Sequence, residues 1–315
     1  MSNYTQNVIC RNMLGLRIAG KVTVILIIAV FVIIIGFLSH PGTLLPSYNP
    51  VNPSTTWSRF INNNGTVDRL QKKYPMATCP LESQTLVEED YVVIEACVKG
   101  YQALEMQSID AREMEYKRVH IHKPWLTRND SVMIEVGGYK GVDAERLISK
   151  GMHPKYIALE PVPMFYELLQ KKFQSDKQFL ILNFGLGRND RTLTIPIQTD
   201  ATSLFRQNKI SMGTATTNIT IRKATTFFDE IKVKDKNVDL LHINCEGCEF
   251  ELLEDLISTG YIRYFNHVQF QFHMHLPYIE KEACRYCQIM KLLGRTHKPM
   301  FQYRHTWQAW EIKTE

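Results

Sequence analysis

Short apolar runs alternate with amphipathic segments from residue 131 to the end of the chain. The apolar runs predict buried strands at 131–138, 155–161, 179–186, 238–244 and 267–275. The amphipathic segments predict helices at 142–150, 163–174, 225–232, 250–259 and 278–293. An extra hairpin strand at 193–197 and two closing strands near 300–305 and 309–313 complete the pattern. Continuous apolar strands that alternate with helices are typical of a mostly parallel sheet covered on both faces, so we expect an α/β fold with an antiparallel edge.

The N-terminal part of the chain contains one long apolar run. Val22–Leu38 has 17 residues and no charge, and as a helix it would span roughly 25 Å, the short end of what crosses a bilayer. Arg11, Arg17 and Lys21 precede the run, and the next basic residue after it is Arg59. Because basic flanks stay in the cytosol, we expect the body of the protein to lie in the lumen.

This topology predicts a single-pass type II membrane protein of the Golgi or endoplasmic reticulum, whose membranes are thin enough for a short span. The alternative is a cleaved signal peptide, but the run exceeds the usual roughly 7–15 apolar residues and lacks a small-x-small cleavage site. Sequons at Asn64, Asn129 and Asn218 are compatible with a glycosylated lumenal body. The expected parts are a cytosolic tail (1–21), a transmembrane signal anchor (22–38), a Pro-rich stem (39–80), a helical cap (81–130) and the α/β domain (131–315).

Composition and charge exclude several classes of protein. Hydrophobic residues make up 44% and charged residues 22%, as in a globular protein, which excludes a disordered chain and a multi-span membrane protein. The formal net charge is +5, but the first 40 residues carry three basic residues and no acid, so the remainder is nearly neutral. Such a body has no electrostatic case for nucleic acid, and no nucleic-acid partner is expected.

Cysteine spacing suggests disulfides. The seven cysteines are Cys10, Cys79, Cys97, Cys245, Cys248, Cys284 and Cys287. Cys79 and Cys97 flank the start of the folded body, and in an oxidising lumen we expect a disulfide between them. The last four form two CxxC pairs, as in structural zinc sites, but the 35 residues between the pairs exceed what a zinc ribbon uses. We therefore expect disulfides or buried thiols there, and no metal site.

Candidate chemistry gathers at the ends of the first two predicted strands. Glu135, Gly137 and Gly141 form the pattern ExGxxxG, and Glu160 ends the second strand. Ligands of open parallel sheets bind beyond the carboxyl ends of the strands, and an acid at the second strand can accept hydrogen bonds from both hydroxyls of a ribose. A dinucleotide site would need GxGxxG. An acid inside the pattern would repel a pyrophosphate, but it suits the positively charged methionyl end of S-adenosylmethionine.

These motifs resemble a known family. ExGxxxG, ALEP at 158–161 and DLLHINCEGCEFELL at 239–253 are similar to the FkbM-type methyltransferases, and most similar to their animal branch with an N-terminal membrane anchor. The resemblance covers Ser131 to Glu315. It implies a Rossmann-like class I methyltransferase sheet and transfer of a methyl group from S-adenosylmethionine to an oxygen, often of a sugar. The family usually has Asp where this chain has Asn244, which weakens any metal-assisted mechanism there.

The resemblance also implies roles for individual residues. Glu135, Gly137 and Gly141 would cradle the methionyl part of the cofactor, and Glu160 would bind its ribose. Asn183, near the third strand end, would border the adenine. Asn244 would lie beside the cofactor after the fourth strand, where the methyl group meets its acceptor.

Three side chains are candidates for taking the proton of the acceptor hydroxyl: Glu246, His273 and His275. The two histidines stand two apart on a predicted strand, so we expect them on one face and within reach of Glu246. A histidine beside a carboxylate is a good general base near neutral pH. The alternative is that one of the histidines is buried in the core and bound to the backbone.

The sequence thus predicts an O-methyltransferase of the secretory-pathway lumen with a glycan hydroxyl as acceptor. A non-enzymatic alternative is a catalytically degenerate methyltransferase fold retained as a binding module, which Asn244 favours. A third hypothesis is an anchored glycosyltransferase, which shares the tail, anchor and stem. Such an enzyme usually needs an Asp-x-Asp triplet for its metal, and the sequence contains none.

Overall fold

The computed structural model describes residues 68–79, 86–105, 110–197, 215–276, 279–303 and 306–314. All of these residues belong to Phe60–Glu315, the second of the two units into which the chain divides. The expected tail and anchor, with Cys10, lie outside the described residues. Within those described ranges, no helix combines the length and the apolar character needed to cross a membrane.

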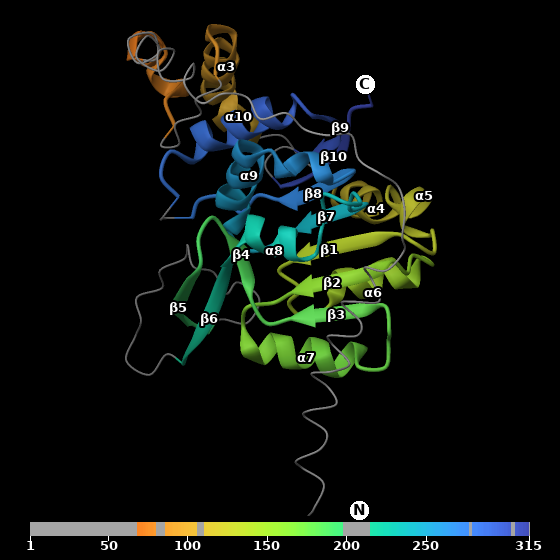
Figure 1. The fold of residues 1–315 in the computed structure, drawn as a ribbon. Helices are drawn as coiled ribbons and strands as arrows, with labels where there is room; N and C mark the ends of the chain where they lie inside the picture. The colour runs from red at the N-terminus through yellow and green to blue at the C-terminus, as the bar shows by residue number, and fades with distance from the viewer. Residues whose placement is uncertain are drawn as a thin grey trace, which may run out of the picture. The chain divides into compact units, whose positions relative to one another are not determined.

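A seven-stranded sheet forms the centre of the second unit (Figure 1). Its strands are β1 (Val132–Val136), β2 (Lys155–Leu159), β3 (Phe179–Leu182), β7 (Leu240–Ile243), β8 (His267–Gln271), β9 (His297–Tyr303) and β10 (Trp307–Ile312). They are ordered β3-β2-β1-β7-β8-β10-β9, and all neighbours from β3 to β8 pair in parallel. β10 runs antiparallel to both β8 and β9. The expected Rossmann-like α/β sheet is confirmed, with the antiparallel strand one place inside the edge.

Helices cover both faces of this sheet. On one face lie α4 (Ala111–His120), α5 (Lys123–Leu126), α6 (Val142–Ser149) and α7 (Pro163–Phe173), whose apolar residues pack with Met133, Tyr156 and Leu240. On the other face lie α8 (Ala224–Glu230), α9 (Cys248–Thr259), η3 (Tyr261–Tyr264) and α10 (Glu282–Leu293), against Ile134 and Leu241. α3 (Glu88–Glu105) packs on α10, and η2 (Pro75–Ala77) packs on α3. The strands are therefore buried on both faces, which explains their continuous apolar sequences.

A second, smaller sheet was not expected. It contains β4 (Gly185–Gly187), β5 (Arg191–Pro196) and β6 (Thr216–Lys223) in the order β4-β6-β5, and it extends from the side of the main sheet in Figure 1. The predicted strand at 179–186 is wrong in extent, because it is interrupted at Asn183 and its last residues join this second sheet.

Three disulfides connect the six cysteines of the described part of the chain. Cys79 is bonded to Cys284, Cys97 to Cys287, and Cys245 to Cys248. The expected Cys79–Cys97 bond is therefore wrong. Cys79, at the end of the expected stem, and Cys97, in α3, are both covalently joined to α10.

The boundary of the stem also needs correction. Residues 68–79 fall in the expected stem, yet residues 68–73 are helical and Leu70 and Ala77 are buried. Both side chains belong to the main hydrophobic core together with residues of α9 and α10. The folded body therefore begins at least ten residues before residue 80.

Candidate functional site

The turn between β1 and α6 requires glycine at two positions. Gly137 has φ +95° and Gly141 has φ +74°, a region that side chains with a Cβ rarely adopt. A Cβ on Gly137 would overlap the backbone carbonyl of Asn244, at 2.8 Å from its carbon. A Cβ on Gly141 would lie 2.7 Å from the ring of Phe173. The turn is thus packed tightly against the loop after β7 and against α7.

Glu160 lies at the end of β2, as expected, and contacts the same turn. One carboxylate oxygen accepts a hydrogen bond from the backbone N–H of Tyr139 at 2.7 Å, and the other from Val162 at 2.8 Å. Burial raises the pKa of Glu160 to about 7, although these two hydrogen bonds oppose the change. Each oxygen keeps a second lone pair, so the carboxylate can still accept a hydroxyl.

Asn183 is exposed after β3. Its side-chain amide donates to the carbonyl oxygens of Glu160, at 2.8 Å, and Pro161, at 3.2 Å. Asn183 therefore fixes the backbone that carries Glu160. Its predicted position beside an adenine stays a prediction.

A cavity of about 360 Å³ opens beyond the ends of β1, β7 and β8. The sheet order reverses direction between β1 and β7, so the cavity lies at the switch point where ligands of such sheets bind. It is lined by Glu115, Arg118, Glu135, Gly137, Gly138, Tyr139, Val142, Asp143, Arg146, Asn244, Gln271 and Trp307. Three of the expected cofactor residues, Glu135, Gly137 and Asn244, therefore line the cavity. A fourth, Gly141, belongs to the turn that borders it.

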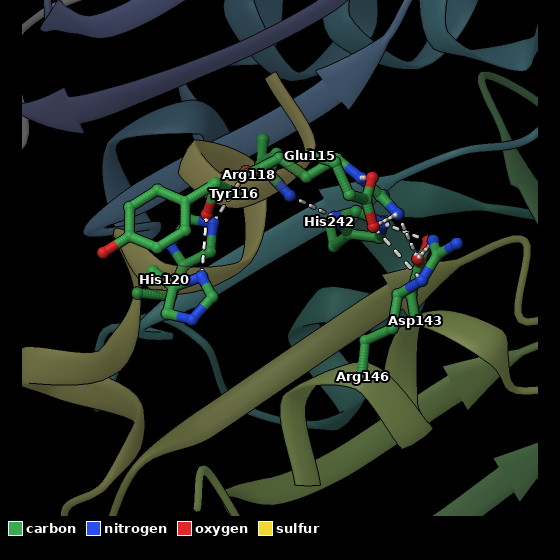
Figure 2. A network of polar contacts seen from close by, with 9 residues as sticks. Glu115, Tyr116, Arg118, His120, Asp143, Arg146 and His242 are labelled. Carbon is green, nitrogen blue, oxygen red and sulfur yellow. Dashed lines mark hydrogen bonds and ion pairs between the residues drawn. The ribbon is translucent and has the colours of Figure 1, made fainter. Parts of the chain in front are cut away.

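Four charged side chains of α4 and α6 form a closed ring of ion pairs at this cavity (Figure 2). Arg118 contacts Glu115 at 2.7 Å and Asp143 at 2.8 Å. Arg146 contacts Asp143 at 3.0 Å and Glu115 at 3.2 Å. We call these four residues the ion-pair ring. Two guanidinium groups and two carboxylates balance, so the ring carries no net charge.

A buried chain of hydrogen bonds fixes His242 behind the ring. The amide nitrogen of Gln269 lies 3.1 Å from Nδ1 of His242 and can only donate, so Nδ1 accepts. Nε2 then carries the proton and donates to Asp143 at 3.2 Å. The other end of Gln269, Oε1, accepts from His122 at 2.7 Å, and burial lowers the pKa of His122 to about 3. Burial alone would raise the pKa of Asp143, but His242 and Arg118 outweigh it and hold the pKa below its ordinary value.

Glu135 is buried at the base of the cavity, with 1% of its surface exposed. Within the described ranges, its Oε2 atom has no hydrogen-bond partner. Burial first, and the nearby Asp143 carboxylate second, raise the pKa of Glu135 well above its ordinary value. Ligand atoms of Glu135, Asp143 and His242 all lie within 4.8 Å of one another, so this corner suits a positively charged group.

The loop between β7 and α9 presents Glu246, and the loop after β8 presents His273. Nε2 of His273 lies 3.0 Å from Glu246, and Nδ1 lies 3.0 Å from the fully buried Glu249. Glu249 also accepts the backbone N–H of His273 at 2.6 Å. Glu246 and His273 therefore come together as expected, with Glu249 as an unexpected third member.

The expectation that His273 and His275 share a strand face is wrong. β8 ends at Gln271, and both histidines belong to the loop that follows. His275 is exposed with φ +59°, and its backbone N–H donates to Glu282 at 2.7 Å. His275 therefore lies outside any strand, and the two histidines do not share a strand face.

Residues 135–297 match the methyltransferase FkbM domain, which is slightly more than half of the 315 residues. The chain belongs to the FkbM methyltransferase family. No curated protein sequence matches it.

Solved structures similar to this FkbM methyltransferase include an FkbM methyltransferase from Methylobacillus flagellatus, with a TM-score of 0.38 and 14% identity. That match covers 81% of this chain but only 60% of the other. A fibrillarin pre-rRNA processing protein of Methanococcus jannaschii has a TM-score of 0.37 and 9% identity, covering 60% and 70% of the two chains. The N-methyltransferase NodS from Bradyrhizobium japonicum, solved with S-adenosylhomocysteine, has a TM-score of 0.33 and 10% identity, covering 68% and 98%.

The pKa of His273 decides its chemical role in this FkbM methyltransferase. Burial would lower the pKa, but the hydrogen bonds to Glu246 and Glu249 outweigh it and raise the pKa to about 9. His273 is therefore protonated at neutral pH and is a poor general base there. It holds Glu246 and Glu249 in place as a cation between two carboxylates.

Replacing His273 by Gln should destabilise the protein in a pH-dependent way. A histidine with a raised pKa stabilises the folded state fully below its unfolded pKa of about 6.5, and the stabilisation is lost as the pH rises through about 9. The loss should be about 3 kcal/mol near pH 6 and should shrink towards pH 9.5. Urea unfolding of both proteins at the two pH values measures it, and an equal difference at both would contradict the assignment.

Proposed function

We propose that this FkbM methyltransferase transfers the methyl group of S-adenosylmethionine to an oxygen atom. The observation that carries the proposal is the cavity at the switch point, where a turn with no room for a side chain at Gly137 or Gly141 meets the buried carboxylate of Glu135. A positively charged ligand would satisfy this carboxylate. Glu160, directly after the neighbouring strand β2, is positioned to accept hydrogen bonds from a ribose.

The reaction makes modest demands on the protein. The cofactor supplies an activated methyl group on its sulfonium. The protein must align an acceptor oxygen behind that methyl group and remove the hydroxyl proton. Asn244 lines the cavity two residues before Glu246 in the loop after β7, so the proton acceptor and the donor site lie on one short segment.

We assign the proton to the carboxylate of Glu246. His273 donates to Glu246 from Nε2 and to Glu249 from Nδ1, so neither ring nitrogen of the cationic histidine can accept a proton. In this arrangement Glu246 is the catalytic residue, and His273 and Glu249 are positioning residues.

Replacing Glu246 by Gln should lower kcat about 100-fold, the usual size of a general-base contribution, and leave donor affinity within about threefold. Steady-state turnover and calorimetric titration measure the two effects. Replacing Glu280, an exposed carboxylate in the same loop region as His275, is the matched control and should change neither. A loss of donor affinity with unchanged kcat would reverse the assignment.

Replacing Glu160 by Gln should weaken binding of adenosine about tenfold, because hydrogen bonds to a charged group contribute about 1.5–3 kcal/mol. Adenosine contains the ribose but not the methionyl end, so it tests Glu160 alone. With a pKa of about 7, Glu160 becomes ionised across neutral pH, and wild-type affinity for adenosine should rise between about pH 6 and pH 8. Calorimetric titration should show no such rise in the variant, and a rise in both proteins would contradict the role.

The proposed acceptor is a glycan hydroxyl in the lumen of the Golgi or endoplasmic reticulum. Three disulfides support an oxidising compartment, and the apolar run at 22–38 supports a membrane anchor. Two sequon asparagines, Asn129 and Asn218, are exposed, as glycosylation requires.

The full chain in detergent, incubated with labelled S-adenosylmethionine and a panel of glycans, tests the reaction. Label should appear in a glycan. It should withstand mild base, which hydrolyses methyl esters but not methyl ethers. If calorimetry shows no binding of S-adenosylmethionine, the enzymatic proposal is wrong and the binding-module alternative gains. If the cofactor binds but label appears only in a non-glycan acceptor, the acceptor assignment is wrong and the methyltransferase assignment stands.

A further inference from the structure

Among the described residues, the ionisable side chains that line the cavity leave one carboxyl group without an ion-pair partner. Five lining residues are ionisable to full charges, and four of them form the ion-pair ring, which is neutral. The fifth is Glu135. Within the described part of the chain it makes no ion pair, and its Oε2 atom accepts no hydrogen bond.

S-adenosylmethionine and its demethylated product differ by one charge. The amino-acid end of both molecules has one ammonium and one carboxylate, which balance, and only the donor has the sulfonium in addition. A neutral ring therefore matches the neutral amino-acid end, and a single unpaired carboxylate matches the sulfonium. The product offers Glu135 no such partner.

We propose that Glu135 makes this site selective for the methyl donor over its demethylated product, by pairing with the sulfonium while the ion-pair ring faces the amino-acid end. The inference rests on the proposed function and extends it to product release. Methyl transfer removes the sulfonium charge and leaves the buried carboxylate without a partner. The affinity for the product should therefore be lower than the affinity for the donor.

The surroundings of Glu135 make the effect strong. The side chain is 1% exposed, where charges interact more strongly than in water. Five groups face it: Arg118 on α4, Asp143 on α6, His242 on β7, Tyr156 on β2, and Glu160 directly after β2. Arg118 is already held by two carboxylates of the ring, and His242 donates to Asp143. Burial and the Asp143 carboxylate raise the pKa of Glu135, and a sulfonium beside it would favour the ionised carboxylate.

Calorimetric titration of the full chain in detergent with S-adenosylmethionine and with S-adenosylhomocysteine tests the proposal. Glu135→Gln keeps the shape of the neutral acid and removes its ability to ionise. It should weaken donor binding about tenfold or more, the usual effect of a lost charge pair, and change product binding less than about threefold. Glu145→Gln is the matched control, because Glu145 lies on the same helix as Asp143 but faces solvent and Lys172. It should change neither affinity.

Titrations in two buffers of different ionisation enthalpy add a readout that needs no variant. Wild-type protein should release more protons on binding the donor than on binding the product, because the sulfonium would lower the pKa of Glu135. Equal proton release for both ligands, equal wild-type affinity for both, or an equal loss of both in Glu135→Gln would overturn the proposal while the methyltransferase assignment stands. If neither ligand binds, the proposed function itself is wrong and this inference is lost with it.

Discussion

Replacing Gly137 by Ala should abolish binding of S-adenosylmethionine and destabilise the protein by about 3 kcal/mol or more. Two costs combine at this position. The left-handed backbone, with φ +95°, costs an L side chain about 1–2 kcal/mol. The new Cβ would also overlap the backbone carbonyl of Asn244, which cannot rotate away as a flexible side chain could. Relief of the overlap would push apart the glycine turn and the loop after β7, the two walls of the cavity.

Gly151→Ala is the matched control for this prediction. Gly151 also has a positive φ, +79°, but a Cβ there would meet no atom within 4 Å. It should cost only about 1 kcal/mol and leave donor affinity unchanged. Thermal unfolding and calorimetric titration of both variants measure the difference. Equal losses of stability in the two variants would show that backbone strain alone matters and that the close approach at Gly137 does not.

Removing the two disulfides that join Cys79 and Cys97 to α10 should destabilise the protein more than the sum of the single removals. With Cys79–Cys284 intact, Cys97–Cys287 closes an effective loop of only about 20 residues, so its loss should cost about 3 kcal/mol. When the remaining bond is then opened, it releases a loop of roughly 200 residues, and this second step should cost about 5 kcal/mol.

Urea unfolding of the two single-disulfide variants and of the variant lacking both, with paired Cys→Ser changes, measures this non-additivity. Opening Cys245–Cys248, whose cysteines are three residues apart, is the control for the removal of thiols as such and should cost about 2 kcal/mol. Strictly additive losses for the two long-range bonds would contradict the loop argument, because each bond would then act independently of the other.

The central sheet could be predicted from the sequence because its strands are buried on both faces. The apolar runs around β1, β2 and β7 contain few polar positions, and helices follow each of them in the expected places. β6 could not be predicted in the same way. Its sequence, TTNITIRK, exposes alternate side chains, and its pairing with β4 and β5 depends on contacts between distant parts of the chain.

In the candidate site too, local sequence patterns could be predicted and contacts between distant segments could not. Gly137 and Glu160 stand out because a glycine turn and a strand-end acid are local patterns. The ion-pair ring does not, since Glu115 and Arg118 precede β1 and meet Asp143 and Arg146 only after α4 packs on the sheet. The disulfide pairing could not be predicted from the spacing of the cysteines either, because six cysteines are compatible with several connectivities.

The connectivity of the disulfides has a consequence for biosynthesis. Cys79 and Cys97 precede their partners by 205 and 190 residues. A ribosome that adds about 5–20 residues per second needs roughly 10–40 s before those partners emerge. Until Cys245 is made, Cys79 and Cys97 carry the only thiols in the described part of the chain, so oxidation in this period would produce the Cys79–Cys97 bond that the finished molecule lacks. The native pairing therefore requires that any such bond can still exchange with the thiols of α10 once that helix has been made.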